Sequence, residues 1–291
     1  MAVEDQSKTA FVTAWGVFVC TVMWFGLRNA PATFQRDMIQ IFGPYLTDFM
    51  RIFLDDLSIF GVKREHLSHL RVCFLKCREV HFSLNPLKCA FAVKSGLLLG
   101  TIISTEGIAV DPDKISAIMK ASPPATPRQC LGFLGQVRWH GRHLRFLAHI
   151  AAPLSALSHT TSFQWSPECD LAFRRLRVQL SKAPIMVPPN WDQCFHVFVD
   201  ALDIAIGSVL MQEQTPRWFR PVYYASRRLS VAEKNYSVTE RECLGMIYSV
   251  KKFRHYLLGK LFYFHVDHSA LVFLVRQQNL TGKLARWMLL L

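Results

Sequence analysis

The stretch Arg51-Ile52-Phe53-Leu54-Asp55-Asp56-Leu57-Ser58-Ile59-Phe60 places two adjacent carboxylates inside an apolar run. Ionised carboxylates are costly to bury unless they are paired or bound to a cation. Apolar residues on both sides of the acids suit two strands, which predicts a β-hairpin with Asp55 and Asp56 at its tip. Oxygen ligands at such a tip suit a hard cation such as Mg²⁺. An ordinary Asp-rich turn fits the same residues, so this stretch alone leaves both interpretations open.

Composition limits the class of protein. The chain has 291 residues, 51% of them hydrophobic, which argues against disorder and is typical of about two folded domains. The formal net charge is +13, and the basic surplus extends over both halves of the chain. Such a distribution favours a polyanionic partner, nucleic acid, over one charged tail. Eight cysteines without a Cys-x-x-Cys pair indicate reduced core thiols.

One uncharged segment, Thr9–Leu27, is long enough to be a membrane span or the core of a signal sequence. Its β-branched residues favour strands, and Gly16 divides it into two strand-length pieces. Glu4 and Asp5 also lie where a signal peptide carries positive charge. We therefore interpret the segment as two strands and expect neither a membrane nor secretion.

The first third of the chain alternates between helix and strand signals. Asn29-Ala30-Pro31 predicts a helix capped by Asn29 that runs to Gly43-Pro44. A second helix is predicted over Arg64–Glu79. Its His and Cys residues resemble a metal site, but ligands on one straight helix cannot surround an ion, so we interpret that helix as structural. Short strands are predicted after it, at His81–Leu84, Phe91–Lys94, Leu97–Ser104 and Ile108–Val110.

The middle of the chain is mostly helical in pattern. Asp111-Pro112 opens a short helix, and the proline-rich residues 122–127 form a linker-like break. Residues Arg128–His149 are predicted to form a basic helical stretch carrying Arg138, Arg142 and Arg145. A further helix begins at Ser166-Pro167-Glu168 and ends before Pro184, and Pro188-Pro189 marks a domain boundary.

Beyond that boundary, carboxylates follow strand signals. Asp200 ends a strand predicted at Phe195–Asp200, and Asp267 ends another at Leu261–Asp267, with further strands at Ile206–Met211 and Val222–Ala225. A helix from about Val238 to Leu257 carries Glu240 and Glu242 near its start. Each acid alone is more often a solvated cap or turn residue. The order strand-Asp, helix-Glu, strand-Asp predicts acids that converge at one edge of a sheet, as in a two-metal nuclease.

Many short motifs in one order then resemble a known family, the reverse transcriptase and RNase H segment of gypsy-class LTR retrotransposon polymerase polyproteins. The resemblance covers nearly the whole chain. Its blocks are Phe25-Gly-Leu-Arg-Asn-Ala-Pro-Ala-Thr-Phe-Gln35, Phe53-Leu-Asp-Asp56, Leu84-Asn-Pro-Leu-Lys-Cys89, Leu99-Gly100, Glu106-Gly107-Ile108, Phe133-Leu-Gly135, Ala152-Pro-Leu154, Phe163-Gln-Trp165, Ala225-Ser-Arg227, Asn235-Tyr-Ser237, Thr239-Glu-Arg-Glu242 and Asp267-His268.

The resemblance implies an α+β and α/β architecture, with the palm and thumb of a reverse transcriptase followed by an RNase H-like domain. We expect the palm in residues 1–121, the thumb or connection in 122–189, and the RNase H-like domain in 190–291. Asp55 and Asp56 would be the polymerase metal acids, and the turn at Leu99-Gly100, within Leu98–Ile102, would hold the primer end. The nucleotide and template pocket would be lined by Phe25, Gly26, Arg28, Asn29, Pro31 and Gln35.

In the RNase H-like domain the resemblance implies that Asp200, Glu242 and Asp267 are the catalytic, metal-binding acids, with Glu240 the less suitable glutamate. Both sites would use two metal ions, Mg²⁺ or Mn²⁺. The partners implied are an RNA template, a DNA primer, an RNA–DNA hybrid and deoxynucleoside triphosphates. The oligomeric state cannot be read from the sequence.

Departures from the family pattern occur at several positions. Phe53 replaces the usual Tyr, Trp24 stands where the family has Pro, and Leu202 and Ile204 replace polar or aromatic residues. By the family's pattern the first polymerase acid would precede Met1, with most of the fingers, and the last nuclease acid would follow Leu291. We therefore expect a fragment truncated at both ends and deficient in polymerisation.

The function predicted from the sequence is that of an RNA-directed DNA polymerase with RNase H activity, which copies RNA into DNA and degrades the RNA of hybrids. The alternative is a non-catalytic remnant or domesticated scaffold that binds nucleic acid. For either function we expect a cytoplasmic retroelement particle or the nucleus as the location.

Overall fold

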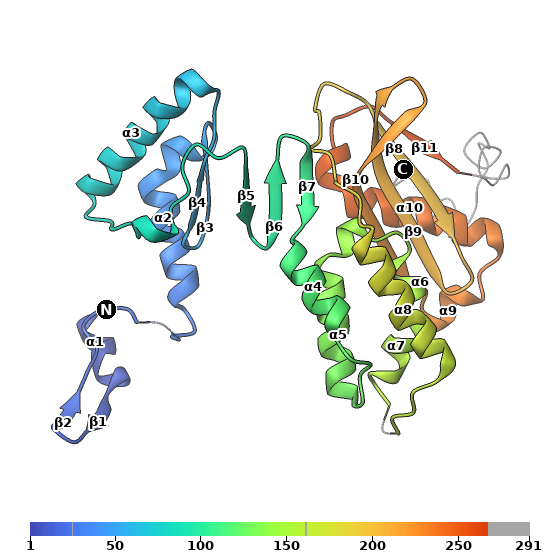
Figure 1. Cartoon of the computed structure of the whole chain (residues 1–291), viewed down its shortest axis with the longest axis horizontal. Helices are drawn as coiled ribbons and strands as arrows, with labels where there is room; N and C mark the ends of the chain where they lie inside the picture. The colour runs from blue at the N-terminus through green and yellow to red at the C-terminus, as the bar shows by residue number, and fades with distance from the viewer. Residues whose placement is uncertain (25, 161, 267–291) are drawn as a thin grey trace. The chain divides into compact units, whose positions relative to one another are not determined.

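The computed structural model describes residues 1–24, 26–160 and 162–266. The chain forms two compact units, residues 1–91 and residues 92–291 (Figure 1). The division into palm, thumb and RNase H-like domain stays a prediction.

The first unit begins with short elements. Helix α1 (Val3–Gln6) and the 3₁₀ turn η1 (Ser7–Thr9) precede an antiparallel hairpin of β1 (Phe11–Thr13) and β2 (Gly16–Phe18). The hairpin occupies part of the uncharged segment Thr9–Leu27, so the prediction of strands there is confirmed. Among the helices in the described part of the chain, none has the length and apolar character to cross a membrane.

The rest of the first unit packs two helices on a hairpin. Helices α2 (Ala30–Leu46) and α3 (Lys63–Glu79) cover strands β3 (Met50–Phe53) and β4 (Asp56–Ile59), with a core that includes Met38, Phe42 and Met50. Helix α2 continues past the predicted end at Gly43-Pro44, because the fully buried Phe42 fixes that turn in the core. The side chain of Asn29 caps no backbone group, so its predicted capping role was wrong.

Two predicted strands are absent from this part of the described chain. Residues 81–84 and 91–94 form turns and coil, separated by the short 3₁₀ helix η2 (Pro86–Lys88). His81 and Ala92 both have φ of 54°, in the left-handed region. A β-strand cannot continue through that backbone conformation, so the apolar pattern was misleading here.

The second unit starts with an antiparallel three-stranded sheet of β5 (Ser95–Leu98), β6 (Thr101–Ser104) and β7 (Gly107–Val110). The strand predicted at Leu97–Ser104 is thus two strands around a turn. Residues Met186 and Val187 link this sheet to the next one. Met186 exchanges two backbone hydrogen bonds with Ile108, and the Val187 N–H donates to the Pro221 carbonyl.

A helical cluster follows the three-stranded sheet. Its buried core joins Phe133 and Leu134 to Phe173 and Leu176. The predicted stretch Arg128–His149 is not one helix: the first helix ends at Trp139, and Phe146 adopts a left-handed φ of 52° before the next α-helix begins at Leu147. The elements are α4 (Pro112–Lys120), α5 (Pro127–Trp139), η3 (Gly141–His143), α6 (Leu147–Ile150), α7 (Ala152–Leu157) and α8 (Pro167–Ser181).

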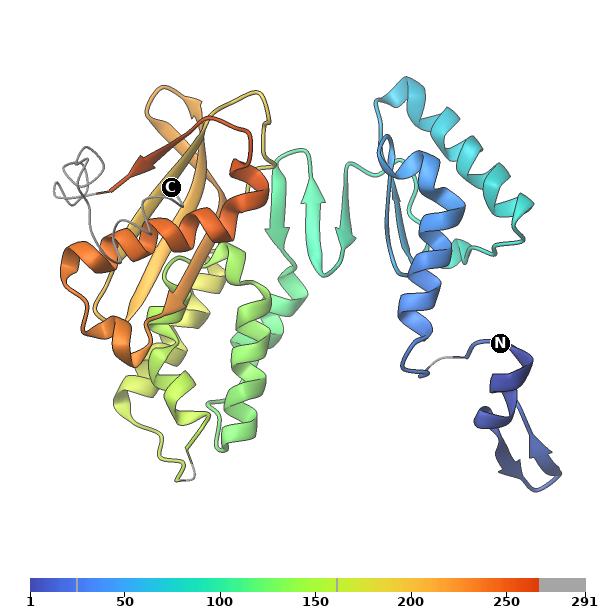
Figure 2. The same ribbon diagram turned by 180° about the vertical axis from the view of Figure 1, so that it is seen from behind.

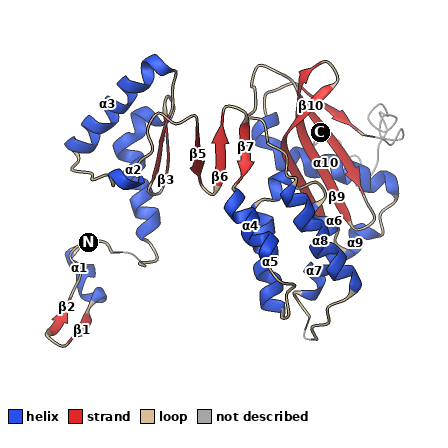
Figure 3. Ribbon diagram, viewed as in Figure 1, coloured by secondary structure: helices blue, strands red, loops and turns tan. Residues whose placement is uncertain are grey.

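The chain then forms a four-stranded sheet in the order β10-β9-β8-β11, in which β11 runs parallel to β8 and the other pairs are antiparallel. Helix α10 packs across one face of this sheet (Figure 2), and α6 lies against β9 and β10 (Figure 3). Strands β8, β9 and β10 are longer than the sequence pattern predicted, whereas β11 is shorter than the predicted strand Leu261–Asp267, whose last residue lies outside the described residues. The elements are β8 (Phe195–Ala201), β9 (Ala205–Thr215), β10 (Trp218–Arg228), α9 (Val231–Lys234), α10 (Val238–Leu257) and β11 (Phe262–His265).

Candidate active site

The paired carboxylates of the first unit lie at the tip of a hairpin. Strands β3 and β4 pair in a register that places Phe53 opposite Asp56, so Leu54 and Asp55 form the turn. Leu54 has a left-handed φ of 52°, which closes this tight connection. Asp55 and Asp56 are both exposed. The predicted hairpin tip is therefore confirmed, whereas the metal-binding role of the acids stays a prediction.

One residue of the predicted nucleotide pocket reaches this turn. The Leu54 N–H donates a hydrogen bond of 2.6 Å to the side-chain oxygen of Gln35, which projects from α2. Gly26, Arg28 and Pro31 lie at or just before the start of α2 and are exposed. No hydrogen bond or ion pair joins those three, or the exposed Asn29, to the acids within the described part of the chain. Phe25 lies outside the described residues.

The predicted primer-holding turn is a two-residue hairpin loop between β5 and β6. Leu99 and Gly100 have φ of 49° and 70°, so both central residues are left-handed, as the right-handed twist of the strands favours. A Cβ atom at Gly100 would lie 2.2 Å from the amino nitrogen of Lys114. The turn itself is confirmed, and its contact with a primer stays a prediction.

In the second unit, Glu242 lies against the backbone of the residue that follows Asp200. Asp200 is half-buried near the end of β8, where Gly207 of β9 is its register partner. The N–H of the following residue, Ala201, donates a hydrogen bond of 3.0 Å to the Glu242 carboxylate on α10. Glu242 is only 4% exposed. The structure thus brings two of the predicted nuclease acids to one edge of the sheet.

The geometry also separates the two glutamates of α10. Glu240 belongs to the helix start, where its carboxylate accepts hydrogen bonds from the Ser237 backbone and hydroxyl in a capping box. The Glu240 carboxylate therefore serves to cap the start of the helix. Glu242 instead accepts a hydrogen bond from β8, and its predicted role as the metal-binding glutamate stays a prediction.

Helix α10 approaches strand β8 closely one turn after Glu242. A Cβ atom at Gly245, one turn after Glu242, would lie 2.6 Å from a methyl carbon of Val199. The close approach of α10 to β8 depends on that glycine. Strand β11 runs parallel beside β8 and ends at His265, two residues before Asp267. Asp267 itself lies outside the described residues.

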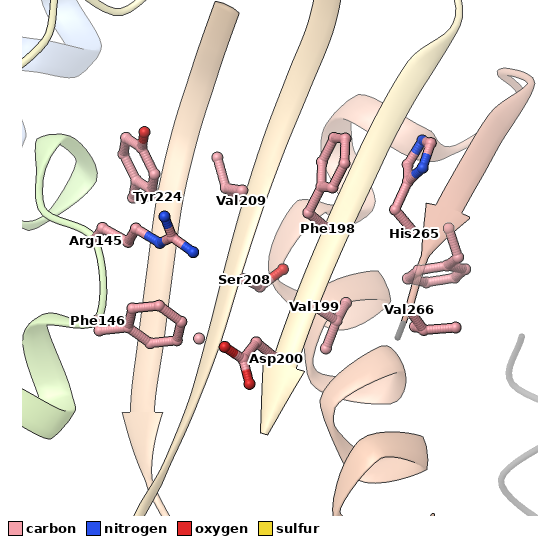
Figure 4. A pocket seen from close by; sticks show the side chains of 12 residues that line it. Arg145, Phe146, Phe198, Val199, Asp200, Ser208, Val209, Tyr224, His265 and Val266 are labelled. Carbon is pink, nitrogen blue, oxygen red and sulfur yellow. The ribbon is translucent and has the colours of Figure 1, made fainter. Parts of the chain in front are cut away.

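A cavity of about 530 Å³ opens beside Asp200 on the sheet face opposite α10 (Figure 4). Phe198, Tyr224 and His265 line it with aromatic rings, and Arg145 borders it from the segment before α6. Burial raises the pKa of Tyr224, while the positive charge of Arg145 acts in the opposite direction. The pKa of His265 is lowered, first by burial and then by the neighbouring His196.

Arg145 and Phe146 were not predicted as part of any site. The charge pattern included Arg145 only among the basic residues of an expected helix. Phe146 carried no signal at all, because its place depends on a contact with Gly207, which is remote in the sequence.

Comparisons with known proteins now define the class. Residues 1–136 match the family described as reverse transcriptase (RNA-dependent DNA polymerase), and residues 190–291 match the RNase H-like domain found in reverse transcriptase. The chain therefore belongs to the reverse transcriptases that carry an RNase H-like domain.

Its relatives are polyproteins of transposons, which confirms the family that the motifs resemble. The chain is 36% identical over 287 residues to the retrovirus-related Pol polyprotein from transposon 297 of Drosophila melanogaster, covering 98% of the chain and 27% of that protein. It is 28% identical over 293 residues to the transposon Tf2-3 polyprotein of Schizosaccharomyces pombe, covering 99% of the chain and 22% of the polyprotein. The chain thus spans about a quarter of each relative's length.

Solved structures show the same fold. A foamy viral protease-reverse transcriptase dRH in complex with double-stranded DNA superposes with a TM-score of 0.85 at 19% identity, covering 99% of this chain and 52% of the other. A foamy viral protease-reverse transcriptase in complex with an RNA/DNA hybrid gives a TM-score of 0.79 at 19% identity, covering 99% and 40%. Together with the family matches, these superpositions confirm the predicted reverse transcriptase and RNase H-like fold.

Proposed function

We propose that this chain contributes the polymerase palm and the ribonuclease H site of a retroelement reverse transcriptase, and that the second unit cleaves the RNA of RNA–DNA hybrids. The observation that carries the nuclease proposal is the hydrogen bond between Ala201 and Glu242. It holds the Glu242 carboxylate at the end of β8, against the residue that follows Asp200. Strand β11 leads toward the same edge, where Asp267 follows it in sequence.

The donor set fits a hard divalent cation. Asp200 and Glu242 supply carboxylate oxygens from a strand and a helix, which are the ligands that Mg²⁺ and Mn²⁺ prefer. A bound metal pair would activate water and stabilise charge on the cleaved phosphate. The protein's own contribution is to hold the two carboxylates in place, because the Ala201 N–H orients Glu242 and the β8–β9 ladder fixes Asp200.

The first unit supports the polymerase proposal through the hairpin tip. Asp55 and Asp56 face solvent at a turn that Gln35 steadies, so the carboxylates are open to a nucleotide and its metal ions. We propose deoxynucleoside triphosphates as substrates and an RNA template with a DNA primer as partners. The location in a cytoplasmic particle or the nucleus stays a prediction.

The test of the nuclease proposal is an RNA-cleavage assay on a labelled RNA–DNA hybrid with Mg²⁺ and with Mn²⁺. We expect cleavage of the RNA strand that is lost in Asp200→Asn and Glu242→Gln and kept in Asp203→Asn. Asp203 is a matched control because it is 91% exposed and paired with Arg241. Cleavage that continues unchanged in Asp200→Asn and Glu242→Gln would refute the site.

A non-catalytic nucleic-acid-binding scaffold is the second candidate, favoured by the net charge of +13. It predicts salt-dependent binding of hybrids without any cleavage, because phosphate neutralisation needs no metal acids. The same preparation therefore separates the two functions: hybrid binding is measured by titration, and RNA cleavage by electrophoresis. A chain that bound no hybrid at low salt would contradict both.

A further inference from the structure

The ring of Phe146 packs against the four-stranded sheet beside Asp200. The ring lies so close to Gly207 that a Cβ atom there would be 2.1 Å from it. Gly207 is the register partner of Asp200, so the ring occupies the space next to that carboxylate (Figure 4). Phe146 also has a left-handed φ of 52°, which a bulky residue adopts only when its surroundings require it.

A second contact fixes the segment that follows. The Ala148 N–H donates a hydrogen bond of 2.9 Å to the hydroxyl of Ser226, which lies across from Gly207 on β10. The chain from Phe146 to Ala148 is thus held on the sheet by one ring and one hydrogen bond. The position of Arg145, directly before Phe146, follows from these contacts.

Arg145 presents its charge to the cavity that Asp200 also lines. Its guanidinium carbon lies 5.1 Å from the centre of the Phe146 ring, and the residue is exposed. Within the described residues no carboxylate pairs with Arg145, and no basic side chain pairs with Asp200. Arg145 is the one lysine or arginine among the residues described as lining this cavity. An accessible cation and a carboxylate therefore border the same space without neutralising each other.

We propose that Arg145 binds a phosphate of the RNA–DNA hybrid beside Asp200, so that the segment before the RNase H-like domain supplies a substrate contact to the nuclease site. The guanidinium suits this role because it pairs with phosphate oxygens through two parallel hydrogen bonds. The inference rests on the proposed nuclease function.

The experiment is binding of a short RNA–DNA hybrid, measured by fluorescence anisotropy without divalent metal, so that no turnover occurs. The intact chain is compared with Arg145→Ala, Arg145→Lys and Arg217→Ala. Arg217 is the matched control, because it is exposed and lies in the turn after β9. That strand ends eight residues beyond Gly207, about 27 Å away at the usual strand rise.

We expect Arg145→Ala to weaken binding about fivefold and to reduce the slope of log K against log salt by about 0.9. Arg145→Lys keeps the slope, because it keeps the charge, and loses part of the affinity. A set of hybrids with one neutral methylphosphonate each then locates the contact. Neutralising the phosphate next to the site should weaken binding by the intact chain and by Arg217→Ala. It should leave binding by Arg145→Ala unchanged.

The outcomes separate this inference from the function on which it rests. If Arg145→Ala keeps the affinity and the phosphate profile of the intact chain, the contact is refuted while the nuclease proposal stands. If the intact chain binds no hybrid at low salt, the proposed function fails, and the contact fails with it. Equal melting temperatures of Arg145→Ala and the intact chain would confirm that the loss of binding is not a loss of folding.

Discussion

Replacement of Gly207 by alanine is expected to displace the Phe146 ring from the sheet. The new Cβ atom would lie 2.1 Å and 2.3 Å from two ring carbons, whereas carbon atoms in contact are separated by about 3.5 Å or more. The ring cannot move alone, because the backbone of Phe146 is in a restricted conformation and Ala148 is bonded to Ser226. The collision therefore has to be relieved by strain or by expulsion of the ring.

Strain and expulsion of the ring are expected to cost similar amounts of folding free energy. Overpacking of this kind costs about 1–3 kcal/mol, and removing an aromatic ring from its contact costs about the same. For a unit of roughly 200 residues, each kcal/mol lowers the melting temperature by about 2–4 °C, so we expect a decrease of roughly 2–12 °C. Calorimetry or circular dichroism on the whole chain measures it.

Two further variants test this explanation, one as a control for the glycine substitution and one that removes the Phe146 ring. Gly132 lies in α5 with open space around its Cα, so Gly132→Ala should leave the stability unchanged or raise it by up to about 1 kcal/mol. Phe146→Ala removes the collision, so adding Gly207→Ala to it should cost little, which gives a coupling of about 1–3 kcal/mol. If the Gly207→Ala chain had the same melting temperature as the intact protein, the proposed contact between Phe146 and Gly207 would be refuted. A double variant whose loss of stability equalled the sum of the two single losses would refute it as well.

Further predictions concern charge. Glu242→Gln should abolish hybrid cleavage, whereas Glu240→Ala should keep it and lower the helix stability by about 1 kcal/mol, measured by thermal unfolding. Burial lowers the pKa of His140 in the folded chain, so the unfolded chain binds a proton at this residue at higher pH than the folded chain does. The stability should therefore fall as the pH decreases below about 6.5. The His140→Gln variant should show a weaker dependence of stability on pH. A hydrogen bond from Arg227 lowers the pKa of Glu233 to about 2, so Glu233→Gln should be less stable than the intact chain at pH 7. That difference in melting temperature should disappear as pH falls from about 4.5 to about 2.

The elements that the sequence predicted well are those with strong local signals. The hairpin at Asp55-Asp56 follows from two apolar runs around a polar turn, and α10 has the bounds expected from its helical spacing. The approach of Glu242 to the end of β8 was predictable in outline, because a helix that covers a sheet can bring its first turn to a strand end. The capping box of Glu240 with Ser237 also follows a local pattern, whereas the choice of Glu242 as the metal-binding residue stays a prediction.

The elements that the sequence did not predict depend on contacts between distant residues. The basic stretch around Arg145 has helical composition, but α5 ends at Trp139, and Phe146, which packs against Gly207, has a left-handed φ directly before α6. The left-handed residues His81 and Ala92 lie within two expected strands, and alanine in particular does not signal that conformation. A contact that forms between remote segments has no local signature, so the cavity beside Asp200 could not be anticipated.

The parallel pairing of β11 with β8 has a consequence for synthesis on the ribosome. Strands β8, β9 and β10 are neighbours in sequence and can pair as soon as they emerge, whereas Phe262 of β11 must find Phe195 across the whole intervening chain. Closing so long a loop is slow compared with forming hairpins. Until then the free edge of β8, which carries Asp200, is open to strands of other chains. This edge is therefore one place where a nascent chain is exposed to mispairing until β11 has formed.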